Sequence, residues 1–105
     1  MSCSKLRELA AVIRSKNAGP FELTLDIIFE SEEEYIRVRD ANALTKEQIA
    51  RLYGTTERRV LAVVPVDNAL AIKITLVRPC VSGAIGDSDV YGAQQHAPLL
   101  DIEIP

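Results

Sequence analysis

Hydrophobic and polar residues alternate in three stretches of the chain. In residues 21–29 an apolar side chain stands at every second position, with mostly polar ones between, and residues 70–76 and 100–104 repeat the pattern. A period of two places alternate side chains on opposite faces, so each stretch is predicted to be a half-buried strand. Residues 60–64 are continuously apolar, which favours a central strand covered on both faces. The Pro-Val-Asp-Asn sequence at 65–68 predicts a turn that makes a hairpin with the next strand.

Two helices are predicted between the first and second groups of strands. Ser31 is followed three residues later by Glu34, and Thr45 by Gln48. Both pairs match the capping box, which satisfies free amide groups at a helix start. The acidic residues 32–34 would lie at the positive end of the first helix dipole, so their charge needs no functional explanation.

The second predicted helix carries further local signals. Leu44 and Ile49 stand at the positions of a hydrophobic staple. Ile49, Leu52 and Tyr53 form its predicted buried stripe. Gly54 predicts a left-handed residue that ends the helix.

Residues 6–14 fit two patterns. Leu6, Leu9, Ala10 and Ile13 match a helix face, whereas Leu9, Ala11 and Ile13 match a strand, and we choose the strand. The resulting order is strand, strand, helix, helix and three strands, which does not alternate as parallel α/β folds do. We therefore predict one α+β domain over residues 1–105, with a mainly antiparallel sheet of about five strands and two helices on one face.

Composition narrows the class of protein. The chain has 105 residues, a net charge of −3 and 48% hydrophobic residues, which is typical of one globular domain and argues against a nucleic-acid-binding role. The apolar runs are too short to cross a membrane, and the N-terminus shows no signal peptide, so we expect a cytoplasmic protein. Cys3 and Cys80 are expected to be free thiols. With a single histidine and no cofactor fingerprint, we predict neither a metal site nor a cofactor.

The longest irregular segment, residues 78–98, is the most informative one for function. It contains three of the five glycines and the single histidine, and connections of this length are usually functional or disordered. We expect it to be ordered. Its polar candidates are Asp87, Asp89, Tyr91, Gln94, Gln95 and His96. His96 is a general acid/base, a metal ligand together with Asp87 and Asp89, or a side chain that holds the loop by hydrogen bonds, and the last is favoured over the metal ligand because a second histidine or cysteine ligand is lacking. Cys80 is expected to be a small apolar residue.

A second loop, residues 15–20, joins the first two strands. Lys16, Asn17 and backbone amides, with Ser15 and Gly19, could bind a carboxylate or phosphate there, although the spacing of a P-loop is absent. The other interpretation is a hairpin turn with a solvated lysine.

One face of the sheet is expected to be polar. Glu22, Thr24 and Asp26 align on it and favour a solvated surface. If helices cover only the opposite face, these groups are joined by apolar neighbours and form a mixed surface suited to a partner or a second copy. The expected apolar neighbours are Ile28, Ala71, Val77 and Leu99.

Two continuous segments, 14–22 and 89–100, resemble the signature segments of a small bacterial family of about this length, catalogued as a domain of unknown function. That family is similar to the C-terminal ferredoxin-like domain of acyclic terpene utilisation (AtuA-like) proteins, and its members are typically encoded beside, or fused to, the large AtuA-like domain. The resemblance implies a ferredoxin-like sandwich and a small partner subunit in catabolism of a carboxylic acid or acyl-CoA. In that relative the first loop reads more like Ser-Gly-Asp-Lys-Gly, where residues 15–19 here read Ser-Lys-Asn-Ala-Gly.

Two hypotheses follow. The first is an accessory or co-catalytic subunit, itself expected to form homo-oligomers, that docks on a larger AtuA-like protein and adds both loops to a shared site. The second is a self-sufficient isomerase or lyase acting on a carboxylate, with His96 as acid/base, Lys16 binding the anion, and Asp87 or Asp89 orienting the imidazole. The ligand-binding candidates are Ser15, Lys16, Asn17, Gly19, Asp87, Tyr91, Gln94 and Gln95, and the catalytic candidates are His96 and Asp89.

Overall fold

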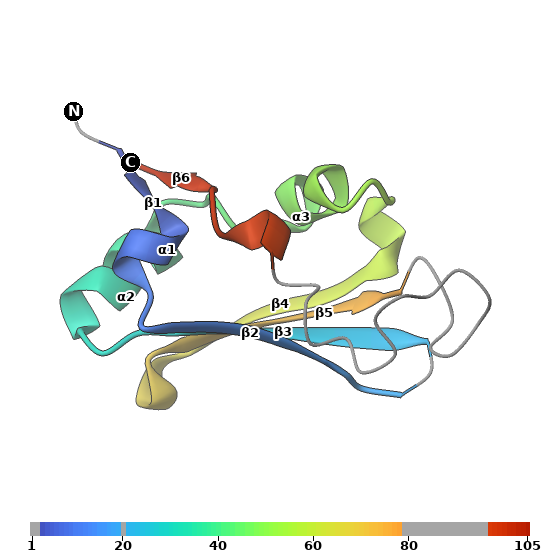
Figure 1. Ribbon diagram of the computed structural model, residues 1–105, viewed down its shortest axis with the longest axis horizontal. Helices are drawn as coiled ribbons and strands as arrows, with labels where there is room; N and C mark the ends of the chain where they lie inside the picture. The colour runs from blue at the N-terminus through green and yellow to red at the C-terminus, as the bar shows by residue number, and fades with distance from the viewer. Residues whose placement is uncertain (1–2, 20, 79–96) are drawn as a thin grey trace.

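The computed structural model describes residues 3–19, 21–78 and 97–105 (Figure 1). Its α-helices are α1 (Leu6–Leu9), α2 (Glu32–Asp40) and α3 (Lys46–Leu52). Its strands are β1 (Ser4–Lys5), β2 (Val12–Asn17), β3 (Glu22–Ile28), β4 (Val60–Val66), β5 (Ala71–Val77) and β6 (Glu103–Ile104). Short 3₁₀ turns lie at Glu57–Arg59, Asp67–Ala69 and Ala97–Leu99.

Four strands form one antiparallel sheet in the order β2-β3-β5-β4, so β3 and β5 are central and β2 and β4 are edges. β1 and β6 pair separately, and this small sheet brings the beginning and the end of the chain together. The predicted α+β class with an antiparallel sheet is confirmed. The described strands are divided between two sheets, where the sequence predicted a single one.

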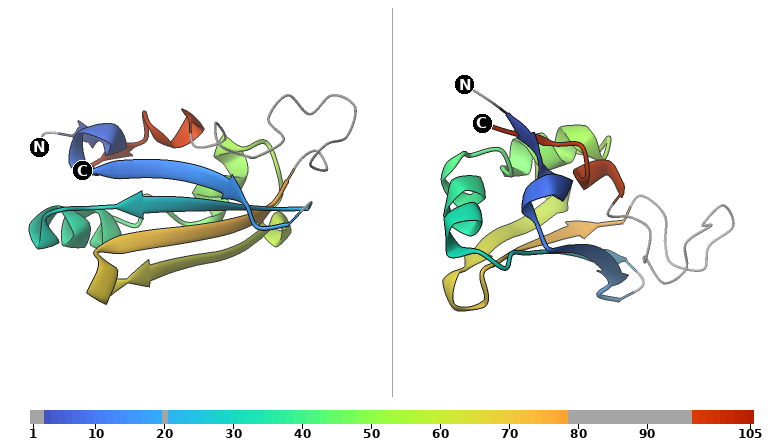
Figure 2. Two further views of the ribbon diagram at one scale, coloured as in Figure 1. Left: turned by 60° about the horizontal axis from the view of Figure 1, so that its bottom comes forward. Right: turned by 60° about the vertical axis from the view of Figure 1, so that its left-hand side comes forward.

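The helices lie on one side of the four-stranded sheet. α1, α2, α3 and the β1-β6 sheet all lie above it in Figure 1, and the views in Figure 2 show the same layering. We call this side the covered face, and it carries the odd-numbered residues of β2 and β3 and the even-numbered ones of β5. The other side, the open face, carries the alternate residues, and no helix or strand among the described residues lies over it.

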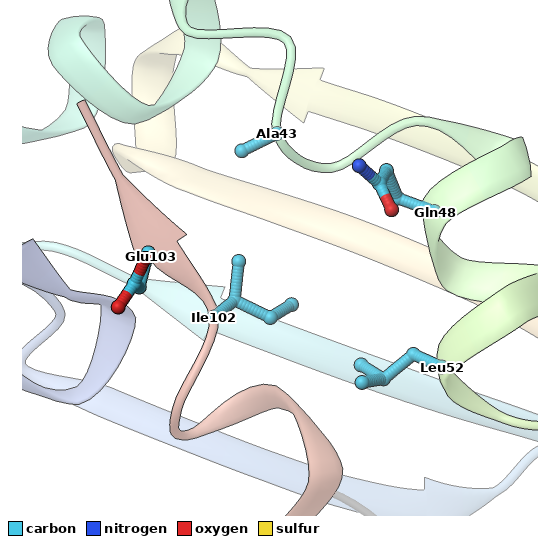
Figure 3. Close-up of a pocket in the computed structure, with 5 residues that line it drawn as sticks. All are labelled: Ala43, Gln48, Leu52, Ile102 and Glu103. Atoms are coloured by element: carbon cyan, nitrogen blue, oxygen red, sulfur yellow. The ribbon is translucent and has the colours of Figure 1, made fainter.

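The α3 helix begins and ends where the sequence predicts. Thr45 Oγ1 accepts a hydrogen bond from the Gln48 amide at 3.2 Å, and Gly54 adopts a left-handed φ of 65°. Leu44 and Ile49 are both buried, but Leu52 of the predicted stripe is 39% exposed. Leu52 borders a surface groove of about 280 Å³, where it and Gln48 face Ile102 and Glu103 (Figure 3). Ala50 takes the buried place instead.

The α2 helix begins at its predicted cap. Ser31 Oγ accepts a hydrogen bond from the Glu34 amide at 3.4 Å. At the C-terminal part of the helix, Arg37 donates from Nε to the carbonyl of Pro105 at 2.9 Å, and from Nη2 to the carbonyl of Ile104 at 3.2 Å. One arginine thus joins the helix layer to the two-stranded sheet, because its planar fork satisfies several carbonyls at once.

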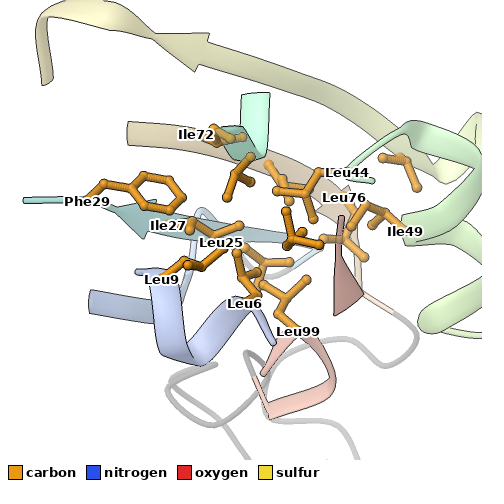
Figure 4. Close-up of a cluster of buried hydrophobic side chains, with 14 of the residues drawn as sticks. Leu6, Leu9, Leu25, Ile27, Phe29, Leu44, Ile49, Ile72, Leu76 and Leu99 are labelled. Atoms are coloured by element: carbon orange, nitrogen blue, oxygen red, sulfur yellow. The ribbon is translucent and has the colours of Figure 1, made fainter. Parts of the chain in front are cut away.

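The core lies between the covered face and the helix layer (Figure 4). Alternate residues of the central strands supply one side of it, and α1, α2, α3 and the C-terminal segment supply the other. Each fully buried leucine or isoleucine contributes on the order of 1.5–3 kcal/mol through removal of apolar surface from water. The buried residues include Leu6, Leu23, Leu25, Ile27, Tyr35, Val38, Ile49, Ile72, Ile74, Leu76, Leu99 and Ile104.

The prediction of a strand over residues 6–14 is wrong in its first half. Leu6–Leu9 form one helical turn, opened by a hydrogen bond from the Lys5 amide to Glu8 Oε1 at 2.8 Å, and the strand begins only at Val12. Leu6 and Leu9 are three residues apart, so a single turn directs both side chains into the core. The two patterns noted in this segment are therefore both present, one after the other.

The prediction of a central, doubly covered strand at 60–64 is also wrong. β4 is an edge strand, and Val64 on the open face is 48% exposed. Pro65 explains why β4 is an edge strand. Proline has no backbone N–H to donate, and such a residue is tolerated where one side of the strand has no neighbouring strand. The register also shifts between Val60 and Ala62, an irregularity common at sheet edges. The predicted hairpin with β5 is confirmed.

Three apolar positions at the strand ends differ from the alternating pattern. Phe21 lies outside β3 and is exposed, and Leu70 adopts a left-handed φ of 49° before β5 begins. At the C-terminal end only Glu103–Ile104 is a strand, because residues 97–99 form a turn that inserts Leu99 into the core. The sequence predicted Leu99 on the open face of the sheet. This prediction is wrong, because Leu99 is buried in the core.

Candidate functional site

The turn between β2 and β3 meets the end of β5 at one end of the four-stranded sheet. The Ala18 amide donates to the Glu22 carbonyl at 2.9 Å and closes the turn, in which Gly19 has a φ of 125° that favours glycine. The Arg78 amide donates to the Phe21 carbonyl at 2.8 Å. The first residue of the predicted 78–98 segment is thereby held directly against the first loop.

A side-chain contact strengthens this junction. Arg78 Nη1 donates to Asn17 Oδ1 at 2.6 Å. The guanidinium group lies almost entirely within the protein, since Arg78 is only 5% exposed. A buried charge is costly unless polar groups surround it, so this arginine requires the polar side chains of the turn. Ser15, also buried, lies two residues from Asn17 on the same face of β2.

The four loop residues predicted to bind a ligand do not all share one side of the sheet. Ser15 and Asn17 are on the covered face, where Arg78 also lies, whereas Lys16 is exposed on the open face. This division follows from the alternation of side chains along a strand. Gly19 lies in the turn itself, where a side chain would meet no other atom. The pair Asn17 and Arg78 is therefore the centre of the described site.

Arg78 was not among the predicted site residues, although the sequence contained a signal for it. Apolar residues occupy positions 72, 74 and 76 on the covered face of β5, and Arg78 is the next residue in that series. A charge in register with core positions marks a place where the interior becomes polar. A guanidinium group beside an amide is chemically suited to a planar anion such as a carboxylate, which it can bind with two parallel hydrogen bonds.

A protein-family comparison covers this whole arrangement. A family model described as a domain of unknown function, DUF4387, matches residues 6–103, which extend from α1 into β6. The chain belongs to the DUF4387 family. No curated protein and no solved structure matches it. Both the β2-β3 turn and Arg78 lie within the DUF4387 match, so the site is part of the domain that defines the family.

Several predicted residues of this DUF4387 domain lie outside the described residues. They are Asp87, Asp89, Tyr91, Gln94, Gln95 and His96, together with Cys80. Cys3 is an exposed free thiol. Within residues 3–19, 21–78 and 97–105, no three His, Cys, Asp or Glu side chains are grouped to hold a metal ion. No helix in those ranges is long and apolar enough to cross a membrane.

A second polar cluster of the DUF4387 domain lies at the opposite end of the sheet (Figure 1). The Tyr35 hydroxyl donates to Asp67 Oδ1, and Arg39 Nη1 donates to the same oxygen at 3.2 Å. These two bonds lower the pKa of Asp67, whereas burial and the neighbouring carboxylate raise the pKa of Tyr35. The cluster borders a cavity of about 270 Å³. Its partners satisfy one another, which indicates that it fixes the β4-β5 turn to α2.

Proposed function

We propose that this protein is a small accessory or co-catalytic subunit. It docks on a larger AtuA-like protein and completes a shared site with the end of its sheet that carries the 15–20 loop and the start of the 78–98 segment. The substrate class is a carboxylic acid or an acyl-CoA, as the resemblance to AtuA-like domains implies. His96 and Asp89 remain the proposed co-catalytic residues, and the ligand-binding set gains Arg78.

The observation that carries this proposal is the hydrogen bond between Arg78 and Asn17. Two loops more than sixty residues apart begin side by side because this bond joins them. Its chemistry agrees with the substrate class, since a guanidinium and an amide bind a carboxylate or the phosphates of an acyl-CoA. Lys16, exposed on the open face of the same end, adds a second positive charge that would attract such an anion.

The described part of this end is suited to binding an anion. It offers cations, an amide and a hydroxyl, which bind and orient a negatively charged group. In the proposal, His96 and Asp89 of this chain act as the acid/base, and the larger protein supplies the rest of the site.

Co-expression with a larger AtuA-like protein from the same source tests the proposal. We expect a stable complex on affinity purification and gel filtration, turnover of a carboxylic acid or acyl-CoA by the complex, and none by the small chain alone. Asn17→Ala should lower kcat/KM of the complex by about tenfold or more without breaking it, because the guanidinium loses its orienting partner. Lys46→Ala, which removes an exposed cation on α3, serves as the matched control and should leave kcat/KM unchanged.

Two results would contradict the proposal. One is a failure of the two proteins to co-purify. The other is full turnover by the small chain alone, abolished by His96→Ala, which would establish the alternative of a self-sufficient isomerase or lyase.

A further inference from the structure

The side chains on the open face of the four-stranded sheet form rows across the strands, and each row has its own chemical character. One row of side chains across all four strands is entirely apolar, because neighbouring strands place these residues in register. Its outer members are well exposed, Val12 at 43% and Val66 at 38%. An apolar row across a sheet face that no described element covers is a surface suited to burial against another protein. The row consists of Val12, Ile28, Ala71 and Val66.

The next row carries opposite charges on the two central strands. Asp26 of β3 stands in register with Lys73 of β5. Asp26 also accepts from Arg14 Nε of β2 at 3.5 Å, and the Arg14 side chain is largely in solvent. Val64 completes the row on β4. One negative and one positive side chain therefore stand at equal distances on either side of the line between β3 and β5.

The third row has short side chains on the two central strands and on β4, and it carries the exposed Lys16 on the edge strand β2. Thr24 and Thr75 face each other across the two central strands, with Ala62 beside Thr75 on β4. Thr24 is only 3% exposed, so its hydroxyl does not stand out from the sheet. This finding corrects the expectation that Thr24 belongs to a solvated surface. Short side chains here allow a second layer to approach closely.

We propose that two copies of the chain pack by their open faces about a two-fold axis that runs between β3 and β5, parallel to the strands. This rotation places β3 of one copy over β5 of the other, and β2 over β4. Each row then faces itself in reverse order. Asp26 faces Lys73 of the partner copy, Ile28 faces Ala71, and Val12 faces Val66, with every contact made twice. On the edge strands Arg14 lies opposite Val64 and Lys16 opposite Ala62, where a long side chain keeps its charged end in solvent at the border of the interface.

The self-complementary pattern is the reason for choosing a second copy as the occupant. Charge complementarity selects partners, since like charges placed opposite each other cost several kcal/mol. Here a single symmetry operation aligns the two opposite charges of the central strands with each other and the apolar row with itself. An isologous interface requires this property, whereas an unrelated partner does not. The Asp26 carboxylate has enough acceptor positions for both Arg14 and the partner copy's Lys73.

The size of the face predicts how tightly the copies associate. Four strands of six or seven residues cover about 20 Å by 23 Å, or ~450 Å² in projection for each copy. About 900 Å² for the pair is smaller than stable specific interfaces and falls in the range of weak, transient ones. We therefore expect a dimer that dissociates on dilution, with a Kd on the order of 10 μM.

Sedimentation velocity of the purified chain between about 5 and about 500 μM tests the dimer directly. We expect the sedimentation coefficient to rise with concentration towards that of a dimer. Lys73→Glu places a carboxylate opposite Asp26 twice, and Asp26→Lys places an ammonium opposite Lys73 twice. Each variant alone should raise Kd by at least about tenfold.

Mixing the two variants gives the decisive result. A heterodimer of Asp26→Lys with Lys73→Glu has an opposite-charge pair at both positions, so association should return in the mixture. Circular dichroism of each variant checks that it is folded, and this recovery cannot come from a misfolded chain. Lys46→Glu, the same charge change on α3 away from the sheet, should leave Kd unchanged.

A chain that remains monomeric at about 500 μM overturns the proposal, as does a mixture that fails to recover association. If Lys73→Glu instead abolishes only co-purification with the larger AtuA-like protein, the open face belongs to that partner and the dimer is again excluded. The dimer does not depend on the proposed function, because Asp26, Lys73 and the apolar row that carry it are not residues of the proposed site. Lys16, at the border of the open face, is the described residue that the two proposals share.

Discussion

The covered and open faces of the four-stranded sheet are built by the same strands but differ in what they tolerate. On the covered face, the central strands place leucine and isoleucine at successive positions, and all are buried. On the open face, the intervening positions mix valine, threonine, aspartate and lysine. Polar groups enter the covered face at Ser15 and Asn17 of the edge strand β2 and at Arg78, the residue after β5. The covered face thus supplies the apolar core, whereas the open face carries mixed polar and apolar side chains.

The largest difference between the faces should appear on removal of an apolar side chain. Leu25 is fully buried on β3, and Leu25→Ala should lower the free energy of unfolding by about 3 kcal/mol, because it leaves a cavity that the core fills only partly. Val64→Ala on the open face should change it by about 0.5 kcal/mol or less. Urea denaturation at low protein concentration, where the chain is monomeric, measures both. Equal losses for the two variants would show that the open face is covered within the monomer.

A sharper comparison uses two neighbouring residues of β2. Asn17→Ala removes the acceptor for Arg78 Nη1 and should cost about 1–3 kcal/mol, because a buried donor loses its partner. Lys16→Ala, on the open face, should cost about 0.5 kcal/mol or less. Thermal melting followed by circular dichroism detects the difference. If Lys16→Ala were the more destabilising variant, the assignment of Asn17 to the polar end of the core would be wrong.

The features predicted correctly from the sequence are those decided by local chemistry. Ser31 and Thr45 cap their helices as expected, since a side-chain oxygen can satisfy a helix amide whatever the rest of the fold does. The β3 and β5 strands follow their alternating patterns because one face of each is buried. Gly54 ends α3 in the left-handed conformation that glycine adopts most easily.

The features predicted wrongly depend on the position of a segment within the whole fold. An apolar run at 60–64 fits either the centre of a sheet or its edge, and Pro65 is the residue that distinguishes the two positions. The sequence does not predict the Leu6–Leu9 turn, because four residues are too few to distinguish the apolar spacing of a helix from that of a strand.

The candidate site was predictable in place but not in composition. The sequence predicted a functional role for the 15–20 loop and for the segment beginning at residue 78, and the structure joins Asn17 of the first to Arg78 of the second by a hydrogen bond. The sequence prediction did not place Asn17 and Lys16 on opposite faces of the sheet. It assigned both residues to a loop, whereas β2 continues through Asn17 and its side chains alternate between the faces. Arg78 was overlooked because it was counted with the loop, although it continues the covered face of β5.

The smallest expected effect concerns the polar cluster of Tyr35, Arg39 and Asp67, which fixes the β4-β5 turn to α2. Hydrogen bonds from Tyr35 and Arg39 lower the pKa of Asp67 in the folded protein. The ionised Asp67 carboxylate therefore stabilises the fold fully above the pKa of about 3.9 that it has in the unfolded chain. This stabilisation is lost as the pH falls through the lower pKa of the folded protein. Asp67→Asn should therefore lower Tm slightly at pH 7, and the difference from the unmodified protein should shrink as the pH falls from about 5 to about 3. The effect is small because the Asp67 side chain is 72% exposed and water screens its charge. Asp40→Asn, which removes another carboxylate bonded to Arg39 but not to Tyr35, is the matched control. A difference in Tm that stays constant over this pH range would show that the charge of the Asp67 carboxylate does not stabilise the β4-β5 turn, and that packing against α2 holds the turn in place.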